Sequence, residues 1–274
     1  MRTILVLILL AAAAFAAAAC SSSSTPGRED IERARESYSK GFYLEAEKDF
    51  ERYLQVEPQG AHRKEAWDRL AEIAVSIKGD YDRAVVLLEA MYLELGDDPD
   101  TAWKIMFQLG EVYSELGNTA KALESFEKCL NHAQDNPDHV YRTQLRMARL
   151  YRSMGSYDLV AATLENCADS AADDEAKAKC MYELAQSYTF ISSWSQASKT
   201  LNALLRLGKI SDETRALAIF LQADIAENDR DYAKARELLE SILETYPNPK
   251  VVETRLAHLP VVEPEPLPLL PPRQ

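Results

Sequence analysis

The stretch FQLGEVYSELGNTAKALESFEKCL, from Phe107 to Leu130, decides the fold of this chain. It predicts two short amphipathic helices that are joined by a tight turn at Gly117 and Asn118. Apolar and small residues recur at helical spacing and so share one face of each helix. They are Leu109, Gly110, Tyr113 and Leu116 in the first helix, and Ala122, Phe126 and Cys129 in the second. One such pair cannot bury its own apolar face, so the pattern requires neighbouring copies.

Six copies of this pattern follow one another at a period near 38 residues. The turn positions are Gly41, Gly79, Gly117, Gly155, Ser192 and Arg230. Glycine takes the left-handed conformation that ends a helix without steric cost, so we expect a tighter or differently capped turn at Ser192. Small or branched residues follow at Ala46, Ala84, Ala122, Val160, Ala197 and Ala235, and large apolar residues at Phe50, Leu88, Phe126, Leu164, Leu201 and Leu239.

Aromatic residues stand two positions beyond most of these turns, where we expect core packing and no chemistry. They are Tyr43, Tyr81, Tyr157, Trp194 and Tyr232, with Thr119 in the third copy. The whole pattern resembles the tetratricopeptide repeat, a helix–turn–helix with the signature W-x2-L-G-x2-Y…A-x3-F…P. The resemblance rests on pieces such as Trp67-x2-Leu70-Ala71, Leu109-Gly110-x2-Tyr113 and Ala122-x3-Phe126. The period of this chain is near 38 residues, whereas that of the family is usually 34 residues.

This resemblance implies an all-α, right-handed α-solenoid of about six repeats over residues 28–259, in which first helices line a concave groove. A short helix over residues 251–259 is expected to cover the last apolar face. Residues 260–274 are rich in proline and predict a disordered tail or a ligand for another domain. The formal charge of −13 argues against nucleic acid as a partner.

The start of the chain, residues 1–19, predicts an export signal. A positive start precedes an apolar run from Ile4 to Ala19, which is short for a membrane span of about twenty residues. Cys20 directly after it resembles the lipobox of bacterial lipoprotein precursors, in which the signal is removed and the cysteine carries acyl chains such as palmitate. The alternatives are ordinary cleavage with Cys20 lost or unmodified, and an uncleaved anchor.

Ser21, the residue after this cysteine, resembles the sorting signal for the outer membrane. The resemblance therefore implies a lipid-anchored protein of the cell envelope, at the periplasmic face of the outer membrane. Residues 20–27 would then be the lipidated cysteine and a flexible tether.

A row of arginines in the fourth copy is the best candidate for a binding site. Arg142, Arg146, Arg149 and Arg152 recur at spacings of four, three and three, so they share one helical face. The family resemblance places this face in the groove, next to the further candidates Phe107, Lys179, Tyr182 and Gln186. The row is either a clamp for an acidic partner segment or C-terminal carboxylate, or a solvated face paired with Glu111, Glu115 or other nearby acids.

Three cysteines lie beyond Cys20, namely Cys129, Cys167 and Cys180. Export implies an oxidising compartment that permits a disulfide. Cys167 and Cys180 flank one loop between repeats, so they are the favoured pair, which leaves Cys129 buried. A catalytic thiol needs a partner base, and no histidine stands at a suitable spacing.

Two loops hold groups that could suggest a metal site. Residues 96–100 carry three aspartates, and residues 132–139 carry two histidines and two aspartates. Neither has the ligand spacing of a calcium or zinc site. We expect Asp100 to cap the next helix, and we predict no metal and no cofactor.

The sequence holds no glycine-rich phosphate loop, Gly-x-Ser-x-Gly, His-Glu-x-x-His or Cys-x-x-Cys motif, so we expect no enzyme. The expected function is a lipid-anchored scaffold that binds an envelope protein or an acidic peptide segment in its groove. The alternative is a structural spacer in an outer-membrane assembly, secretion or pilus machine, which would use the convex faces and the tail.

Overall fold

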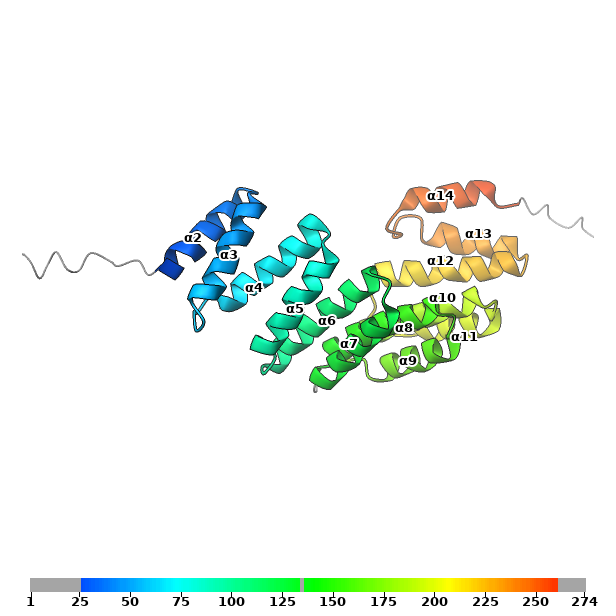
Figure 1. The fold of residues 1–274 in the computed structure, drawn as a ribbon. Coiled ribbons are helices and arrows are strands. Elements are labelled where there is room, and N and C mark those ends of the chain that lie inside the picture. The colour runs from blue at the N-terminus through cyan, green and yellow to red at the C-terminus, as the bar shows by residue number, and fades with distance from the viewer. Residues whose placement is uncertain (1–25, 134–135, 261–274) are drawn as a thin grey trace, which may run out of the picture. The chain divides into compact units, whose positions relative to one another are not determined.

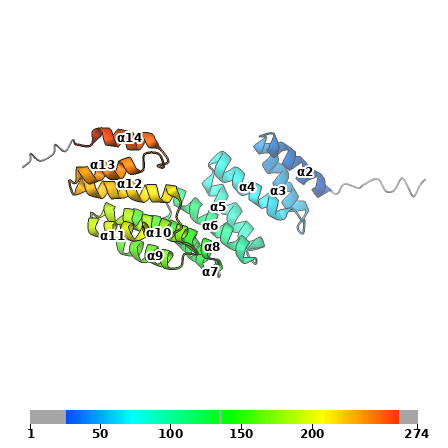
Figure 2. The same ribbon diagram turned by 180° about the vertical axis from the view of Figure 1, so that it is seen from behind.

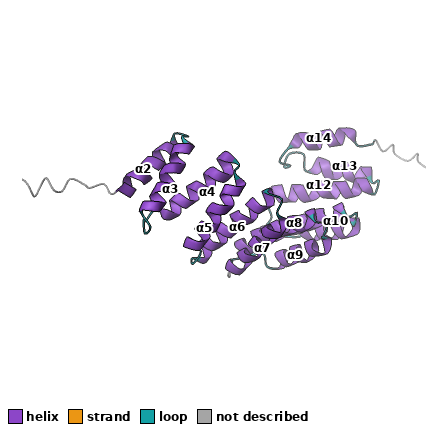
Figure 3. Ribbon diagram, viewed as in Figure 1, coloured by secondary structure: helices purple, strands orange, loops and turns teal. Residues whose placement is uncertain are grey.

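The computed structural model describes residues 26–133 and 136–260, and this part of the chain is helical throughout, without strands (Figure 3). The all-α prediction is thereby confirmed. The predicted signal of residues 1–19, Cys20 and most of the tether lie outside the described residues, as do residues 261–274 of the predicted tail.

The helices follow one another in pairs along the chain (Figure 1). The first helices are α2 (Pro26–Ser39), α4 (Arg63–Glu72) with its continuation η1 (Ile73–Lys78), α6 (Pro99–Glu115), α8 (Pro137–Ser153), α10 (Asp174–Phe190) and α12 (Asp212–Asn228). The second helices are α3 (Tyr43–Val56), α5 (Tyr81–Leu95), α7 (Thr119–His132), α9 (Tyr157–Asp169), α11 (Trp194–Leu204) and α13 (Tyr232–Ser241). A final helix, α14 (Pro249–His258), lies where the capping helix was expected.

All six turns share one backbone conformation. The four turn glycines have φ values of 79°, 62°, 70° and 70°, and Ser192 and Arg230 adopt 57° and 62°. In four of the turns, the amide after the turn residue donates to a carbonyl five residues back, as from Ser156 to Tyr151 and from Ser193 to Tyr188. The expected tighter turn at Ser192 is therefore wrong: the same hydrogen bond is kept, at the steric cost that a side chain pays in the left-handed region.

The second copy contains one extra residue inside its first helix. Ala71 and Ala84 are 13 residues apart, whereas Gly110 and Ala122 are 12 apart. The extra residue is accommodated in η1, a π-helical segment with a wider turn. Accordingly, the amide of Asp80 donates to Ala74, six residues back rather than five.

The core is built from the predicted repeat positions. The six small or branched residues and the six large apolar residues listed above are each at most 1% exposed. A Cβ atom on Gly110 would lie 2.6 Å from Cε1 of Phe126, so glycine permits the close approach of α6 and α7. The aromatic residues two beyond each turn are only partly buried, because they stand at the first position of the second helix, where the packed interface ends.

Two helix starts differ from the expected ones. Asp98, not Asp100, caps α6, because its side chain accepts a 2.9 Å hydrogen bond from the Thr101 amide. Pro99 causes this, since proline favours the first helical position and places the cap one residue earlier. Asn136 caps α8 in the same way ahead of Pro137, so Asp138 and His139 belong to the helix and not to a loop.

The described residues form two compact units, and α6 contributes to both. The first ends at Thr101 and includes Glu111–Gly117; the second consists of Ala102–Gly110 and the residues after Gly117. In the first, α3 packs on α2, α4 and η1, and α5 on α4 and η1. In the second, α10 packs on α8, α9, α11 and α12 (Figure 2). The second unit ends with α14, which buries Val252 against the core of α12 and α13.

Candidate functional site

A groove crosses the first helices of three successive repeats in the second unit. It is a hollow of about 360 Å³ whose lining comes from α8, α10 and the start of α12. The lining residues are Tyr141, Leu145, Arg149, Glu175, Lys179, Tyr182, Glu183, Ser211, Glu213, Thr214 and Leu217. Three of the predicted residues, Arg149, Lys179 and Tyr182, are therefore brought together here.

Helical spacing explains why these side chains share the groove. Tyr141, Leu145 and Arg149 recur every four residues along α8, and Glu175, Lys179 and Tyr182 recur at four and three along α10. The stripes between them point into the core, where Ala178 and Ala185 of α10 are fully buried. One face of α10 thus holds the repeats together while the other remains accessible.

Glu183 forms ion pairs with two of the predicted arginines. Its Oε1 lies 2.6 Å from Nη2 of Arg149, and its Oε2 lies 3.2 Å from Nη1 of Arg152. Arg152 also contacts the side-chain oxygens of Gln186, at 3.5 Å, and Ser187, at 3.3 Å. The Glu183 side chain is 14% exposed, whereas Arg149 is 47% and Arg152 21% exposed, so solvent partly screens these pairs. These two arginines are consequently ion-paired within the protein.

Glu175 ties the start of α12 to α10. Its carboxylate accepts hydrogen bonds from the Ser211 amide at 2.8 Å and the Thr214 hydroxyl at 2.7 Å, and lies 3.4 Å from the Lys179 ammonium. Burial acts to raise the pKa of Glu175, but these hydrogen bonds and the Lys179 charge outweigh it, so the net shift of the pKa is downward. Glu175 is therefore a carboxylate at neutral pH.

Tyr182 forms part of the groove floor. Burial, the nearby Tyr246 phenol and the Glu183 and Asp224 charges raise the pKa of its phenol to about 12. The hydroxyl therefore keeps its proton across the physiological range and can donate a hydrogen bond to a ligand.

The other two arginines of the row lie over aromatic rings near the N-terminal half of α8. The guanidinium of Arg142 is 5.2 Å from the ring centroids of both Trp103 and Phe107, and that of Arg146 is 5.8 Å from Phe107. His139 stacks on Trp103 at 3.8 Å. Phe107 is 9% exposed, so the chain's own side chains cover the ring that was expected to line the groove. The structure thus divides the row into two pairs with different surroundings.

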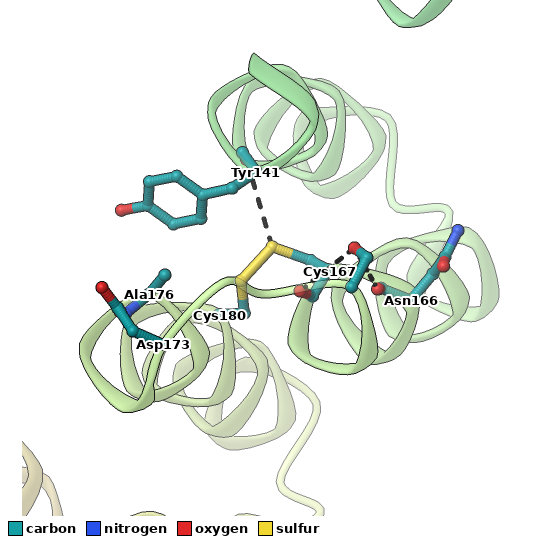
Figure 4. The surroundings of a disulfide bond; sticks show 7 residues. Tyr141, Asn166, Cys167, Asp173, Ala176 and Cys180 are labelled. Atoms are coloured by element: carbon teal, nitrogen blue, oxygen red, sulfur yellow. Dashed lines mark hydrogen bonds between the residues drawn. A yellow bond between two sulfur atoms is a disulfide. The ribbon is translucent and has the colours of Figure 1, made fainter. Parts of the chain in front are cut away.

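A disulfide joins Cys167 of α9 to Cys180 of α10, with 5.9 Å between the Cα atoms (Figure 4). Cys167 Sγ lies 4.0 Å from the carbonyl oxygen of Tyr141, and Cys180 follows Lys179, so the bond lies beside the groove. Cys129 is a buried free thiol, and burial raises its pKa to about 12. A thiol that stays protonated is a poor nucleophile, so Cys129 is a core residue.

Several groove residues were not expected from the sequence. Glu183 and Glu175 are separated from their partners on other helices by 31 to 39 residues, close to one repeat period. That separation is the signal that could have identified them, because residues one period apart lie on adjacent helices. Ser211 and Thr214 also form a helix start, in which the Thr214 amide donates to Ser211 Oγ at 3.1 Å.

The described residues hold neither a cluster of metal ligands nor a membrane-spanning helix. Across residues 26–133 and 136–260, no three His, Cys, Asp or Glu side chains are grouped so that they could hold a metal ion. No helix within the described ranges is both long and apolar enough to cross a membrane.

Comparison with known families identifies the repeats. A model described as tetratricopeptide repeat matches residues 100–167, and a second one with that description matches residues 217–249. These segments are tetratricopeptide repeats, a type that forms protein-interaction scaffolds. No curated protein matches the chain.

Solved structures share the fold at low sequence identity. BtubC (BKLC) from P. vanneervenii is 14% identical with a TM-score of 0.56, over 91% of this chain and 100% of that chain. Pseudomonas aeruginosa pilF is 13% identical with a TM-score of 0.51, over 84% and 96% of the two chains. PilW, described as a widely conserved type IV pilus biogenesis factor, is 18% identical with a TM-score of 0.52, over 84% and 98%. At these identities the likeness shows the fold alone, and it confirms the predicted α-solenoid class.

Proposed function

We propose that this chain of tetratricopeptide repeats is a scaffold that holds an extended segment of a partner protein in the groove across α8, α10 and α12. The observation that supports it best is the groove itself, because three successive first helices contribute side chains to one hollow. A segment lying across it would contact three repeats at once. No step of catalysis is part of this proposal.

The lining of the groove defines what the segment should carry. Its floor holds Tyr141, Leu145, Tyr182 and Leu217, which suit an apolar or aromatic anchor residue. Its rim holds charges that are already paired, Arg149 with Glu183 and Lys179 with Glu175. A partner carboxylate must therefore compete with Glu183 for Arg149, whose side chain is 47% exposed. We therefore propose that the segment binds through an apolar anchor residue. One partner carboxylate would in addition replace Glu183 at Arg149.

The anchor and the location form the second part of the proposal. Residues 1–20 resemble a lipoprotein signal, so we place the protein on the periplasmic face of the bacterial outer membrane, held by acyl chains on Cys20. The Cys167–Cys180 disulfide fits an oxidising compartment. Mass spectrometry of the mature N-terminus tests the anchor, because an unmodified cysteine there would refute it.

Photo-crosslinking in intact cells tests the groove. A photoreactive amino acid replaces Leu145 or Leu217 in the groove, and Leu159 of α9, which is 48% exposed and lies outside the groove lining, serves as the matched control. We expect one discrete crosslinked protein from the groove positions and its loss when Tyr182→Ala is added. Absence of such a product, or capture that Tyr182→Ala leaves unchanged, would contradict groove binding.

The alternative function is a structural spacer within an envelope machine of the outer-membrane assembly, secretion or pilus type. Its support is the fold shared with PilW, described as a pilus biogenesis factor, which is a likeness of fold alone. A spacer would use the convex faces and the tail, so crosslinks from Leu159 with none from Leu145 or Leu217 would favour it.

A further inference from the structure

The segment from Leu184 to Ser211 contains no aspartate or glutamate, although the chain carries a formal charge of −13. Its charged residues are Lys199, Arg206 and Lys209. Helix α11 (Trp194–Leu204) and the turn after it lie within this segment. A local excess of positive charge is thus built into an acidic protein.

The structure places part of this segment on one outer surface. Ser195, Lys199, Asn202 and Arg206 recur at spacings of four, three and four and are all exposed; we call them the α11 face. They line a hollow of about 650 Å³, which Trp194 of α11, Ile225 of α12 and Asp229, the residue directly after α12, also border. The hollow therefore combines two cations, one carboxylate, hydrogen-bonding side chains and one partly buried aromatic ring.

The two cations of the α11 face are available to a partner. Neither Lys199 nor Arg206 forms an ion pair with any residue that the structure describes, in contrast to Arg149 and Arg152 of α8. Asn202 is held in place, because its Oδ1 accepts a 2.8 Å hydrogen bond from Nε2 of Gln222. The face consequently offers two cations that form no ion pair, beside a positioned amide.

We propose that the α11 face binds an acidic segment of a partner protein. Lys199 and Arg206 are seven residues apart, which separates them by about 10 Å along a helix or its continuing turn. The segment should therefore carry carboxylates about that far apart, with an apolar or aromatic side chain that contacts Trp194. The charge-assisted hydrogen bonds would supply much of the specificity.

An acidic protein segment fits better than an anionic membrane. The cations border a hollow, into which the plane of a lipid bilayer does not reach, and Ser195 and Asn202 can hydrogen-bond to peptide groups. The net charge of −13 also repels an extended anionic surface. A short acidic segment instead experiences mainly the nearby charges of Lys199 and Arg206, because salt screens charges beyond a Debye length of about 8 Å. This surface is separate from the groove, so the proposal is independent of the proposed function.

Fluorescence anisotropy of labelled peptides tests the proposal with the full chain in detergent. The probe is a ten-residue peptide that alternates glutamate with leucine and contains one tryptophan. The test variant is Lys199→Glu with Arg206→Glu. The control is Lys234→Glu with Lys250→Glu, an equal charge change on exposed residues of α13 and α14. A lysine–leucine peptide serves as the probe of opposite charge.

We expect the acidic peptide to bind and the test variant to weaken binding about tenfold or more, because two charge-assisted contacts become repulsive. The control should change it less than about twofold, and the basic peptide should not bind this face. The proposal would be overturned if the acidic peptide did not bind, or if the test and control variants lost affinity for it equally. It would also be overturned if the test variant lost binding to phosphatidylglycerol vesicles but not to the acidic peptide. If the glutamate variant does not fold by circular dichroism, Lys199→Gln with Arg206→Gln is measured against the same criteria.

Discussion

The groove and the α11 face belong to the same unit and both carry cations, but they use them differently. In the groove, Glu183, which is 14% exposed, pairs with Arg149 and also with Arg152, which is not part of the lining. On the α11 face, Lys199 and Arg206 form no ion pair with any described residue, although Asp229 borders the same hollow. A row of arginines can thus serve the packing of adjacent repeats, whereas the two cations of the α11 face remain accessible to a partner.

The reason lies in the geometry of a repeat array. A residue about one period further along the chain lies on the next equivalent helix, so Glu183 of α10 reaches Arg149 and Arg152 of α8. Each such pair joins neighbouring repeats, and its formation removes a charge from the surface that a ligand meets. Whether an arginine of the row is available to a ligand therefore depends on the adjacent repeat as much as on the row itself.

Removal of the disulfide should have the largest effect on the difference between the two surfaces. Cys167→Ser with Cys180→Ser opens a loop of sequence separation 13, which we expect to cost about 3 kcal/mol of unfolding free energy. Binding in the groove should weaken, because the bond lies beside Tyr141, and peptide binding to the α11 face should remain. Thermal unfolding followed by circular dichroism and the two binding assays measure this.

Reductant is the matched control for that prediction. It should lower the melting temperature of the wild type to that of the double variant and leave the double variant unchanged. A wild type that melts at the same temperature with and without reductant would contradict it.

The variant Glu183→Gln should make the groove resemble the α11 face. The change keeps the size of the side chain and leaves Arg149 and Arg152 without their carboxylate, which we expect to cost about 1–2 kcal/mol of unfolding free energy. In return, the groove should acquire affinity for the acidic peptide. Urea unfolding and anisotropy measure the two effects.

Glu213→Gln provides the comparison for this variant. Glu213 lines the same groove and forms no ion pair within the ranges the structure describes, so its replacement should change stability by less than about 0.5 kcal/mol. Equal losses from both variants would show that the Glu183 pairs are not what distinguishes the groove.

Ser192→Gly should have the smallest effect of these variants. It changes the stability of the protein without changing its charge. Ser192 has a φ of 57°, which glycine adopts without a steric penalty, so the variant should gain about 1 kcal/mol of unfolding free energy. The turn leads into α11 but carries none of its charges, so peptide binding to the α11 face should stay the same. A stability loss, or altered peptide affinity in anisotropy, would contradict this.

The sequence was sufficient for the parts of the fold that repeat. Helical spacing and the recurring turns predicted the buried positions from Ala46 to Leu239, because the same packing problem is solved six times. It was not sufficient for features that occur once. Pro99 moved a helix cap to Asp98, and Ser192 adopts a conformation that is usual for glycine.

The candidate site was predictable only in part for a related reason. Helical spacing identified Arg149, Lys179 and Tyr182, which lie in one groove. It did not identify Glu183 as the partner of the arginines, because that choice depends on how adjacent helices are aligned. Nor did it show that Phe107 lies beneath Arg142 and Arg146, since an aromatic ring has the same pattern whether it is exposed or covered.

The extra residue in η1 has a consequence for how such a chain changes in length. A wider helical turn stores the added residue, and the turn at Gly79 keeps the same left-handed conformation as the others. An insertion inside a first helix is therefore absorbed within its own repeat and is not passed on to the next one. This array can therefore hold a single additional residue in a first helix while the later repeats keep their phase.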